Sequence, residues 1–426
     1  MLKMLHFADA HIDMANFGRH DPSTGLPVRV MDFLKSLDEI VDAAVSERVD
    51  LVLFAGDAFK DRSPSPTFQR EWGRRLMRLS RAGIPTLMLV GNHDLSPAAG
   101  RAHAIQEFET LEIPYIHVAS RPLFLKPEQL NGVHVQVIAI PWVSRSSMMA
   151  ALELSGTDPG GVYSELGARL SELVSRWLNE VDPNLPVILT AHASVQGALY
   201  GGERSVMLGS DLVLPGSMVK DPRLSYVALG HIHKPQDVNQ GVQPPVIYPG
   251  SIERVDFGEA ADEKFYVIAH VEQGQPTTVE WVKLNGRRFI DRSVALDPGS
   301  VELVGDLPTI EGCMSRIYSV MPTMEDLAGS ILRLTIDYPR NWEEFIDETD
   351  LRRYCEGAFE FHLIRKPQVE TRLRIPTDQT ISSMTPVDLL NIYWKTQSVS
   401  TENAAYLTRL AQEVFGDAGD SEPTDN

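Results

Sequence analysis

The sequence predicts an α/β protein built from layered sheets and helices, and two observations support this class. Apolar strand-like runs alternate with helical patterns through the first half of the 426-residue chain, as in domains whose helices pack on a mainly parallel sheet. After about residue 245 strand-like runs follow one another without helices, which predicts a second, mostly antiparallel sheet packed on the first. The chain is too long for one ordinary core, so we expect two or three domains.

Six apolar runs of the first half are predicted to be strands: LKMLHFAD, DLVLFAGD, PTLMLVGN, VHVQVIAIPW, PVILTAHA and YVALGHIH. The segment VRVMDFLKSLDEIVDAAVSERV, between the first two runs, is predicted to be an amphipathic helix. Its apolar residues recur at helical spacing and would form one buried face. They are Val30, Phe33, Leu34, Leu37, Ile40, Val41 and Ala44.

The pattern of predicted strands and helices changes near Gly286, so we place the end of a first domain, 1–285, just before it. In residues 286–372 the runs SILRLTIDYP, NWEEFIDETDLRRYCEG and AFEFHLIRKP predict a compact strand–helix–strand unit. Residues 373–416 begin with the linker-like IPTDQTISSMTP and continue with two short amphipathic helices, PVDLLNIYWKTQ and TENAAYLTRLAQEVF. The acidic end, 417–426, is predicted to be disordered.

Composition excludes several classes of protein. Cys313 and Cys355 are the only cysteines, which argues against a disulfide scaffold or a cysteine zinc site and favours the cytoplasm. We find neither an apolar run of about 18 residues nor a signal peptide. The net charge of −19 argues against a module that holds nucleic acid by its own electrostatics, since phosphate neutralisation needs clustered Lys and Arg.

Polar residues able to bind a metal follow the carboxyl ends of five predicted strands. In an open α/β sheet these ends form the ligand crevice, so residues far apart in sequence converge there. The set holds imidazole, carboxylate and amide groups but no thiolate, which suits manganese, iron or zinc. The seven candidate ligands are Asp9, His11, Asp57, Asn92, His192, His231 and His233.

A pair of metal ions accounts for this set better than a single one. One four-coordinate zinc would leave several buried polar groups without partners, which is costly. Two metals that share a bridging carboxylate use all seven residues, and Asp57, alone at its strand end, is the natural bridge. In the motif GHIH, alternate residues of an extended segment point to opposite sides, so His231 and His233 could serve different metals.

The five blocks DAH, GD, GNHD, AHA and GHIH occur in the order of the calcineurin-like metallophosphoesterase signature, and the chain resembles that superfamily. The resemblance implies a four-layer α/β/β/α sandwich with a small α+β capping domain and C-terminal helices. Within the superfamily the chain resembles the SbcD-type nuclease subunits of SbcC–SbcD DNA double-strand-break repair complexes. The segment YPGSIERVDFGE, the strand–helix–strand unit and the helical ending carry this narrower match.

The resemblance implies a role for each site residue. It places Asp9, His11, Asp57 and His233 on one metal, and Asp57, Asn92, His192 and His231 on the other. Manganese is the expected metal, with magnesium, iron and zinc as the alternatives. His93 is the implied catalytic non-ligand, and Asp94 is expected to orient it through the far ring nitrogen.

The implied reaction is two-metal hydrolysis of DNA phosphodiesters, as 3′–5′ double-strand exonuclease and single-strand endonuclease. Some relatives carry histidine three residues after the bridging aspartate, where this chain has Lys60, so the balance of the two activities stays open. One alternative is a metallophosphatase or small-substrate phosphodiesterase with the same site. Another is a scaffold that binds metal only for structure, against which the His93–Asp94 pair argues.

The implied partners are DNA, a coiled-coil ATPase of SbcC type bound through the C-terminal helices, and a second copy of the chain. The expected homodimer uses helices around 67–82 and 98–111. On the first, an apolar stripe is interleaved with arginines that could instead track DNA, and the remaining alternative is a surface helix on the chain's own core. The stripe is Phe68, Trp72, Leu76 and Leu79, and the arginines are Arg70, Arg74, Arg75, Arg78 and Arg81.

Overall fold

The structure is a computed structural model of the chain. It describes residues 1–17, 19–95, 102–143, 159–201, 212–305, 307–368, 385–396, 399 and 401–416. The described residues fall into two compact units. The larger takes those of 1–291, 324–332 and 357–360, and the smaller those of 292–323, 333–356 and 361–426. The predicted tail 417–426 and most of the predicted linker, 375–384, lie outside the described residues.

The first sheet of the larger unit has six strands in the order β14-β13-β1-β2-β3-β4. Its centre is parallel from β1 to β4, while β13 runs antiparallel to β1 and to β14. The strands are β1 (Leu2–Phe7), β2 (Leu51–Phe54), β3 (Thr86–Leu89), β4 (Ile116–Ala119), β13 (Phe265–Val271) and β14 (Thr278–Lys283).

The second sheet also has six strands, in the order β11-β12-β10-β7-β6-β5. Its four central strands are parallel, and the edge strands β5 and β11 are antiparallel to their neighbours. The strands are β5 (Leu123–Leu125), β6 (Gln136–Ile140), β7 (Val187–His192), β10 (Tyr226–Gly230), β11 (Gln236–Asp237) and β12 (Val246–Tyr248). The short pair β8 (Ser194–Val195) and β9 (Val213–Leu214) lies outside this sheet.

The prediction that the late strands form a second, mostly antiparallel sheet is wrong. The late strands do not form a sheet of their own, because β12 joins the second sheet while β13 and β14 extend the first. Strand β13 is buried on both faces: Val267 and Ala269 face the core between the sheets, and Tyr266 and Ile268 face the outer helices. All six predicted strands of the first half are present, as β1, β2, β3, β6, β7 and β10.

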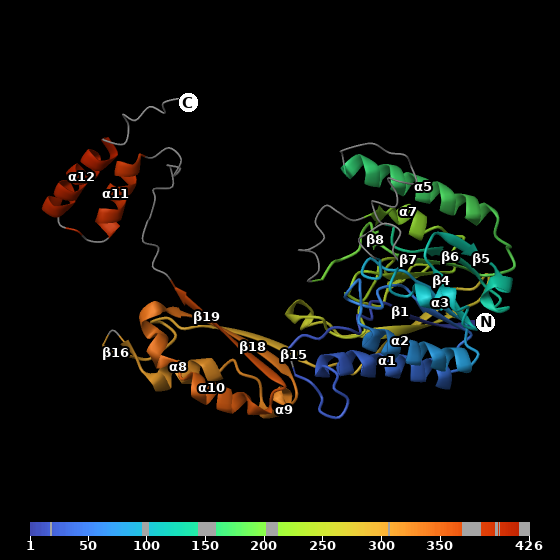
Figure 1. The fold of residues 1–426 in the computed structure, drawn as a ribbon, viewed down its shortest axis with the longest axis horizontal. Helices are drawn as coiled ribbons and strands as arrows, with labels where there is room; N and C mark the ends of the chain where they lie inside the picture. The colour runs from blue at the N-terminus through green and yellow to red at the C-terminus, as the bar shows by residue number, and fades with distance from the viewer. Residues whose placement is uncertain are drawn as a thin grey trace. The chain divides into compact units, whose positions relative to one another are not determined.

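Four layers result from the packing of helices on both sheets (Figure 1). The seven apolar residues predicted for one helix face are all buried on α1 (Val28–Ser46), which covers the first sheet together with α2 (Pro66–Arg81) and α3 (Gln106–Thr110). Helices α5 (Pro159–Asn179) and α7 (Gly216–Val219) cover the second. A third core lies between the sheets, and the predicted α/β/β/α sandwich is confirmed.

The smaller unit has its own core around the three-stranded sheet β15-β18-β19. Thr309 caps the Gly312 N–H of α8, and Asp347 caps the Asp350 N–H of α10, as residues of these types commonly do. The elements from β15 onward, some of whose residues belong to the larger unit, are β15 (Phe289–Ala295), β16 (Leu303–Val304), β17 (Leu307–Pro308), α8 (Ile310–Tyr318), α9 (Met324–Leu327), β18 (Ile331–Pro339), η3 (Arg340–Phe345), α10 (Glu348–Tyr354), η4 (Cys355–Gly357) and β19 (Glu360–Gln368).

The predicted C-terminal helices are present as α11 (Pro386–Thr396) and α12 (Thr401–Gly416). They lie against each other, with a hydrogen bond of 2.8 Å from the Thr408 hydroxyl to the Asn391 side chain. Two single-turn 3₁₀ helices of the larger unit, η1 (Pro127–Leu130) and η2 (Phe257–Glu259), complete the described elements.

Candidate metal centre

The structure brings the seven predicted ligands together at one end of the sandwich. Asp9 and His11 follow β1, Asp57 follows β2 and Asn92 follows β3, all from the first sheet. His192 ends β7, and His231 and His233 follow β10, both in the second sheet. Because these strands are parallel neighbours within each sheet, their carboxyl ends open onto the same crevice.

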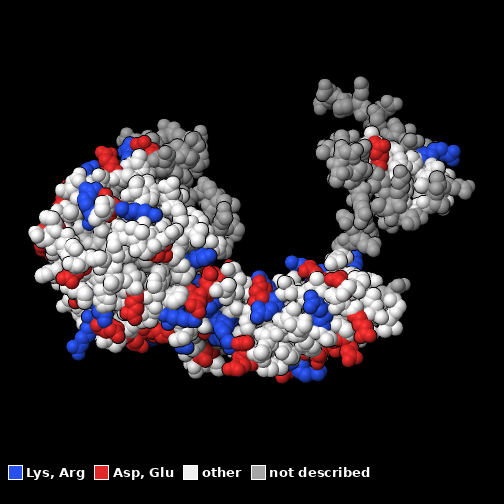
Figure 2. All heavy atoms as spheres, turned by 180° about the vertical axis from the view of Figure 1, so that it is seen from behind, with Lys and Arg blue, Asp and Glu red and all other residues white. Residues whose placement is uncertain are grey.

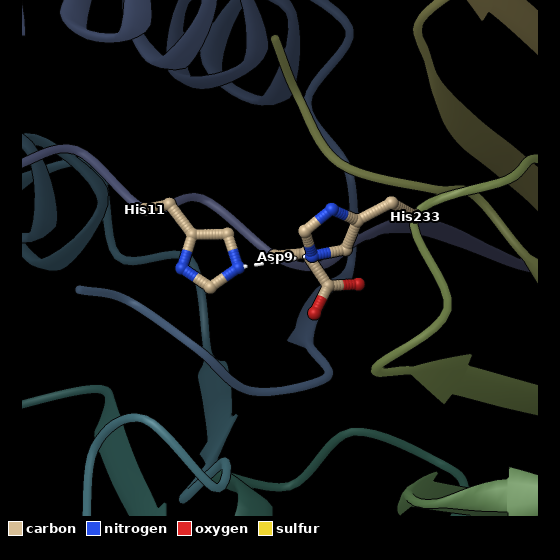
Figure 3. Close-up of side chains that lie close together, drawn as sticks. All are labelled: Asp9, His11 and His233. Atoms are coloured by element: carbon tan, nitrogen blue, oxygen red, sulfur yellow. Dashed lines mark hydrogen bonds between the residues drawn. The ribbon is translucent and has the colours of Figure 1, made fainter. Parts of the chain in front are cut away.

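One group of possible ligands is formed by Asp9, His11 and His233, whose side chains point toward one another in Figure 3. One ligand atom from each lies within 4.8 Å of the others. The Nε2 atoms of His11 and His233 are 3.1 Å apart. Two imidazole nitrogens that face each other with a carboxylate beside them form a donor set suited to a divalent transition metal.

A second group is formed by Asp9, Asp57 and His192, again with ligand atoms within 4.8 Å of one another. The Nε2 atom of His192 lies 3.4 Å from the Asp57 carboxylate and 3.0 Å from Oδ1 of Asn92. The Nδ1 atom of His231 is also 3.0 Å from that amide oxygen. Asn92, His192 and His231 therefore converge beside Asp57.

Two carboxylates link the groups. Asp9 belongs to both, and it accepts the His231 backbone N–H at 3.0 Å. Asp57 lies 3.4 Å from His192 and 3.9 Å from Nε2 of His11. Both carboxylates thus face imidazoles of the two sets, which fits a pair of cations held by shared acidic ligands.

Each of three histidines is oriented by a hydrogen bond at its Nδ1 atom. His11 is 3.2 Å from the Phe59 carbonyl, His192 is 2.6 Å from the Ala55 carbonyl, and His233 is 2.7 Å from a carboxylate oxygen of Glu259. A carbonyl partner requires a proton on Nδ1, which leaves the lone pair of Nε2 free for a metal. The Nε2 atoms of all three rings lie toward the ligand cluster, so the donor set fits divalent cations.

Residue-type reasoning missed the network behind His233. Glu259 bonds the His233 ring and also the buried ammonium of Lys264 at 2.7 Å, and Lys264 donates to the Ser251 hydroxyl at 2.8 Å. Burial would raise the pKa of Glu259, but Lys264 and His233 hold that pKa well below its usual range. The sequence did contain a signal for this network, because Ser251 and Glu259 are the Ser and the final Glu of the family-like segment GSIERVDFGE.

The buried carboxylates of the centre shift the pKa of the histidines beside them, and this electrostatic environment favours cations. Burial would raise the pKa of Asp57, but His192 holds that pKa below its usual range. Burial would lower the pKa of His192, yet Asp57 and Asp9 raise it to about 9. Burial also raises the pKa of Asp9 and lowers that of His11. A cation at this place would displace the proton from His192, so metal binding should release protons.

His93 is half-buried at the edge of the cluster, with its ring centroid 5.2 Å from that of His11. Its Nδ1 atom is 2.9 Å from the Lys60 carbonyl, and its backbone N–H donates to Asp57 at 2.8 Å. Burial lowers the pKa of the His93 imidazole, an effect that Asp57 partly opposes.

The expected orientation of His93 by Asp94 is wrong. The Asp94 carboxylate instead accepts the backbone N–H groups of Asp57, Ala58 and Gly91, at 2.9 to 3.0 Å. It is fully buried, and burial together with the nearby Asp57 raises its pKa to about 7. Asp94 therefore holds the loop that carries Asp57. The Lys60 carbonyl, instead of Asp94, orients the His93 ring.

Four site residues have positive φ angles, which side chains other than glycine rarely adopt: Asp9 (50°), His11 (39°), Asp57 (63°) and His231 (101°). Such backbone strain tends to occur at functional sites, where the surrounding structure enforces it. The glycines of the motifs leave room for the ligands. A Cβ atom on Gly91 would overlap the Asp57 carboxylate, and one on Gly56 would overlap the His192 ring.

The predicted role of the α2 apolar stripe in dimerisation is also wrong. Trp72, Leu76 and Leu79 are 0 to 3% exposed, and with Phe68 they pack in the chain's own core. Four of the five arginines on this helix pair within the chain. Arg70, Arg74 and Arg75 reach Glu71, and Arg75 and Arg78 reach Asp38 on α1. Of the second expected dimer segment, 98–111, residues 98–101 lie outside the described residues.

Trp142 is a further residue at the site that sequence reasoning did not single out. Its half-buried ring lies 4.8 Å from the His231 ring, measured between centroids, and 6.2 Å from that of His192. It follows β6, a strand with no metal-binding residue at its end, so ligand chemistry gave no signal. It forms an aromatic wall beside the ligands.

Comparisons with known proteins relate the chain to metallophosphoesterases. The calcineurin-like phosphoesterase family profile matches residues 2–235. The SbcD subunit of the SbcCD nuclease of Rhodobacter capsulatus is 32% identical over 257 residues, 56% of this chain and 60% of that protein. The uncharacterised metallophosphoesterase YhaO of Bacillus subtilis is 26% identical over 64% of this chain and 58% of its own. The DNA double-strand break repair protein Mre11 of Archaeoglobus fulgidus is 25% identical over 85% and 79%.

This chain thus spans about 60% of the length of the first two relatives. All three have names of metallophosphoesterases, nucleases or DNA repair proteins. Within the part of the chain that the structure describes, no helix is both long and apolar enough to cross a membrane.

Proposed function

The chain belongs to the calcineurin-like phosphoesterase family, and from this premise we propose that it is a two-metal-dependent DNA nuclease. It would act as a 3′–5′ double-strand exonuclease and single-strand endonuclease, and as the nuclease subunit of an SbcC–SbcD-type complex. The observation that carries the proposal is the convergence of the seven candidate ligands beside a half-buried His93. Relatives named as nuclease and DNA repair proteins support the choice of DNA as the substrate.

In the proposed mechanism, one cation would be held by Asp9, His11, Asp57 and His233. The other would be held by Asp57, Asn92, His192 and His231. When bound, two manganese ions would offset the charge of the phosphodiester and activate the attacking water. His93 donates Nδ1–H to the Lys60 carbonyl, so its Nε2 atom is the one available to the substrate. Only the imidazolium form carries a proton on both nitrogens, and it would give its Nε2 proton to the sugar oxygen as the bond between phosphorus and this oxygen breaks, which leaves the neutral ring with its Nδ1–H.

The acidic charge shapes the proposed partnership. On the face seen in Figure 2, Lys and Arg are interspersed with Asp and Glu, and the chain carries a net −19. Weak, salt-sensitive DNA binding by the isolated chain is therefore expected, with an SbcC-type ATPase supplying most of the grip. Helices α11 and α12 would dock on the coiled coil of that partner in the cytoplasm.

We retain a homodimer in the proposal, but through other residues than the α2 stripe. Leu111, directly after α3, is 69% exposed. An apolar residue so open at the end of the second expected segment is a better candidate for contact with another copy than the buried stripe of α2.

Digestion of labelled blunt and hairpin DNA, with manganese and with or without the ATPase subunit, tests the function. Wild-type chain should shorten blunt DNA and open hairpins, and His192→Ala, which removes a ligand, should not. Parallel assays with p-nitrophenyl phosphate esters address the small-substrate alternative. Rapid turnover of these esters with no cleavage of either DNA would overturn the nuclease proposal and favour that alternative.

A further inference from the structure

The loops after β1 and β2 are joined by a ladder of hydrogen bonds. The backbone N–H groups of Asp9, Ala10 and Ile12 donate to the carbonyls of Gly56, Asp57 and Ala58, at 3.0, 2.8 and 3.1 Å. These loops carry three of the predicted ligands. The ladder fixes their spacing up to Ala58, and among the described residues it does not extend to residues 59–61 through backbone bonds.

Asp13 continues the ladder with its side chain. One carboxylate oxygen accepts the Lys60 N–H at 2.5 Å, and the other accepts the Asp61 N–H at 2.9 Å. The residue is 9% exposed, so both bonds form largely out of water, where charge-assisted hydrogen bonds are strong. No role was predicted for Asp13. Among the described residues, it forms no direct hydrogen bond with any of the seven candidate ligands.

The turn that Asp13 holds presents two successive carbonyls to two histidines. The Phe59 carbonyl is 3.2 Å from Nδ1 of His11, and the Lys60 carbonyl is 2.9 Å from Nδ1 of His93. Each bond fixes which ring nitrogen carries the proton and where the other points. The two successive peptide groups of the Phe59–Asp61 turn, whose N–H groups Asp13 accepts, therefore support a candidate ligand and the proposed proton donor.

We propose that Asp13 is a positioning residue for the phosphodiesterase reaction: it anchors the Phe59–Asp61 turn, and through the Lys60 carbonyl it aims the Nε2 atom of His93 at the leaving oxygen. This inference rests on the proposed function. Its distinguishing consequence is that losing Asp13 harms a reaction that needs a proton from His93 more than one that does not. A merely structural role would slow both reactions equally.

The test compares Asp13→Asn with Asp61→Asn, a matched loss of charge one residue beyond Lys60. Asp61 accepts a local N–H from Ser63 in an exposed turn. Asp13→Asn should lower kcat on DNA about 10- to 100-fold with little change in KM. Its effect on bis(p-nitrophenyl) phosphate should be much smaller, because p-nitrophenolate leaves without a proton. Asp61→Asn should leave both rates near those of the wild type.

A double-mutant cycle links the effect to His93. Adding Asp13→Asn to His93→Ala should change the residual DNA cleavage little, since the group being aimed is gone. Equal loss on both substrates, or a full loss in the His93→Ala background, would overturn the proposal. If Asp13→Asn does not fold, Asp13→Glu provides the same comparison, because it keeps the charge and displaces the turn by one methylene.

Hydrogen–deuterium exchange of the metal-free protein gives a readout without turnover. Asp13→Asn should speed exchange at the Lys60 and Asp61 amides, and Asp61→Asn should not. Unchanged exchange at both amides would refute the anchoring. A wild-type chain that cleaved only the aryl ester would refute the nuclease proposal, while amide exchange would still decide whether Asp13 anchors the turn.

Discussion

The Nδ1 atom of His233 lies 2.7 Å from the Glu259 carboxylate, and Glu259 in turn pairs with the fully buried Lys264. This arrangement ties the orientation of a candidate metal ligand to a buried ion pair. Breaking the pair should therefore affect both stability and metal affinity.

Glu259→Gln should lower the free energy of unfolding by about 3–5 kcal/mol, because it leaves Lys264 buried without its counter-ion. It should also weaken manganese binding about 10- to 100-fold, as the loss of an outer partner of a ligand commonly does. Urea unfolding of the metal-free protein and calorimetric titration with manganese measure the two effects. Glu263→Gln, which breaks the exposed pair with Lys283, is the control and should change both values little.

His93→Ala should retain its manganese and lose about 10²- to 10⁴-fold in turnover, the usual contribution of a general acid. Elemental analysis of the purified variant, alongside DNA cleavage rates, makes the check. Loss of metal in proportion to activity would show instead that His93 is a ligand. His192→Ala, in contrast, should lose both.

Stability should fall with acid pH in part because of His6. Burial lowers the pKa of His6 in the folded chain from 6.5 to about 3, so between these values the unfolded chain binds the extra proton. The part of the free energy of unfolding that comes from His6 is fully present above pH 6.5. It decreases by about 1.4 kcal/mol per pH unit as the pH falls toward 3. His6→Asn should show a shallower decline of the urea midpoint over this range. Parallel curves for the two proteins would contradict the assignment.

Leu76→Ala should lower the free energy of unfolding by about 2–5 kcal/mol, because Leu76 lies in the chain's own core. Its mass in sedimentation should equal that of the wild type. Arg74→Ala, on the exposed side of α2, serves as the control and should be nearly neutral. A change in mass without a change in stability would restore the dimer role of the stripe.

Short-range patterns predicted most of the elements that build the site. The residues after β1, β2, β3, β7 and β10 could be assigned to one crevice because parallel strands place their carboxyl ends together. Two features escaped this logic. The assignment of β13 to the first sheet depends on pairing with β1, far away in sequence, and strand patterns do not encode partners. Helix α5 was not predicted, although its apolar face is periodic.

The orientation of His93 shows a second limit of the sequence. Asp94 is adjacent in the motif GNHD, so a carboxylate–imidazole pair was the natural expectation. The acceptor is instead the carbonyl of Lys60, a backbone group that carries no residue-type signal. For the same reason Asp13 gave no sign of its contacts, which are with backbone N–H groups on another loop.

The seven candidate ligands divide between the two sheets, four from the first and three from the second. Cations held by both sets would therefore cross-link the two halves of the sandwich as well as prepare the substrate. Only the folded chain brings all seven candidate ligands together. Raising the manganese concentration above the dissociation constant should therefore raise the melting temperature. A chelator would then be expected to shorten the lifetime of the protein as well as to stop its chemistry.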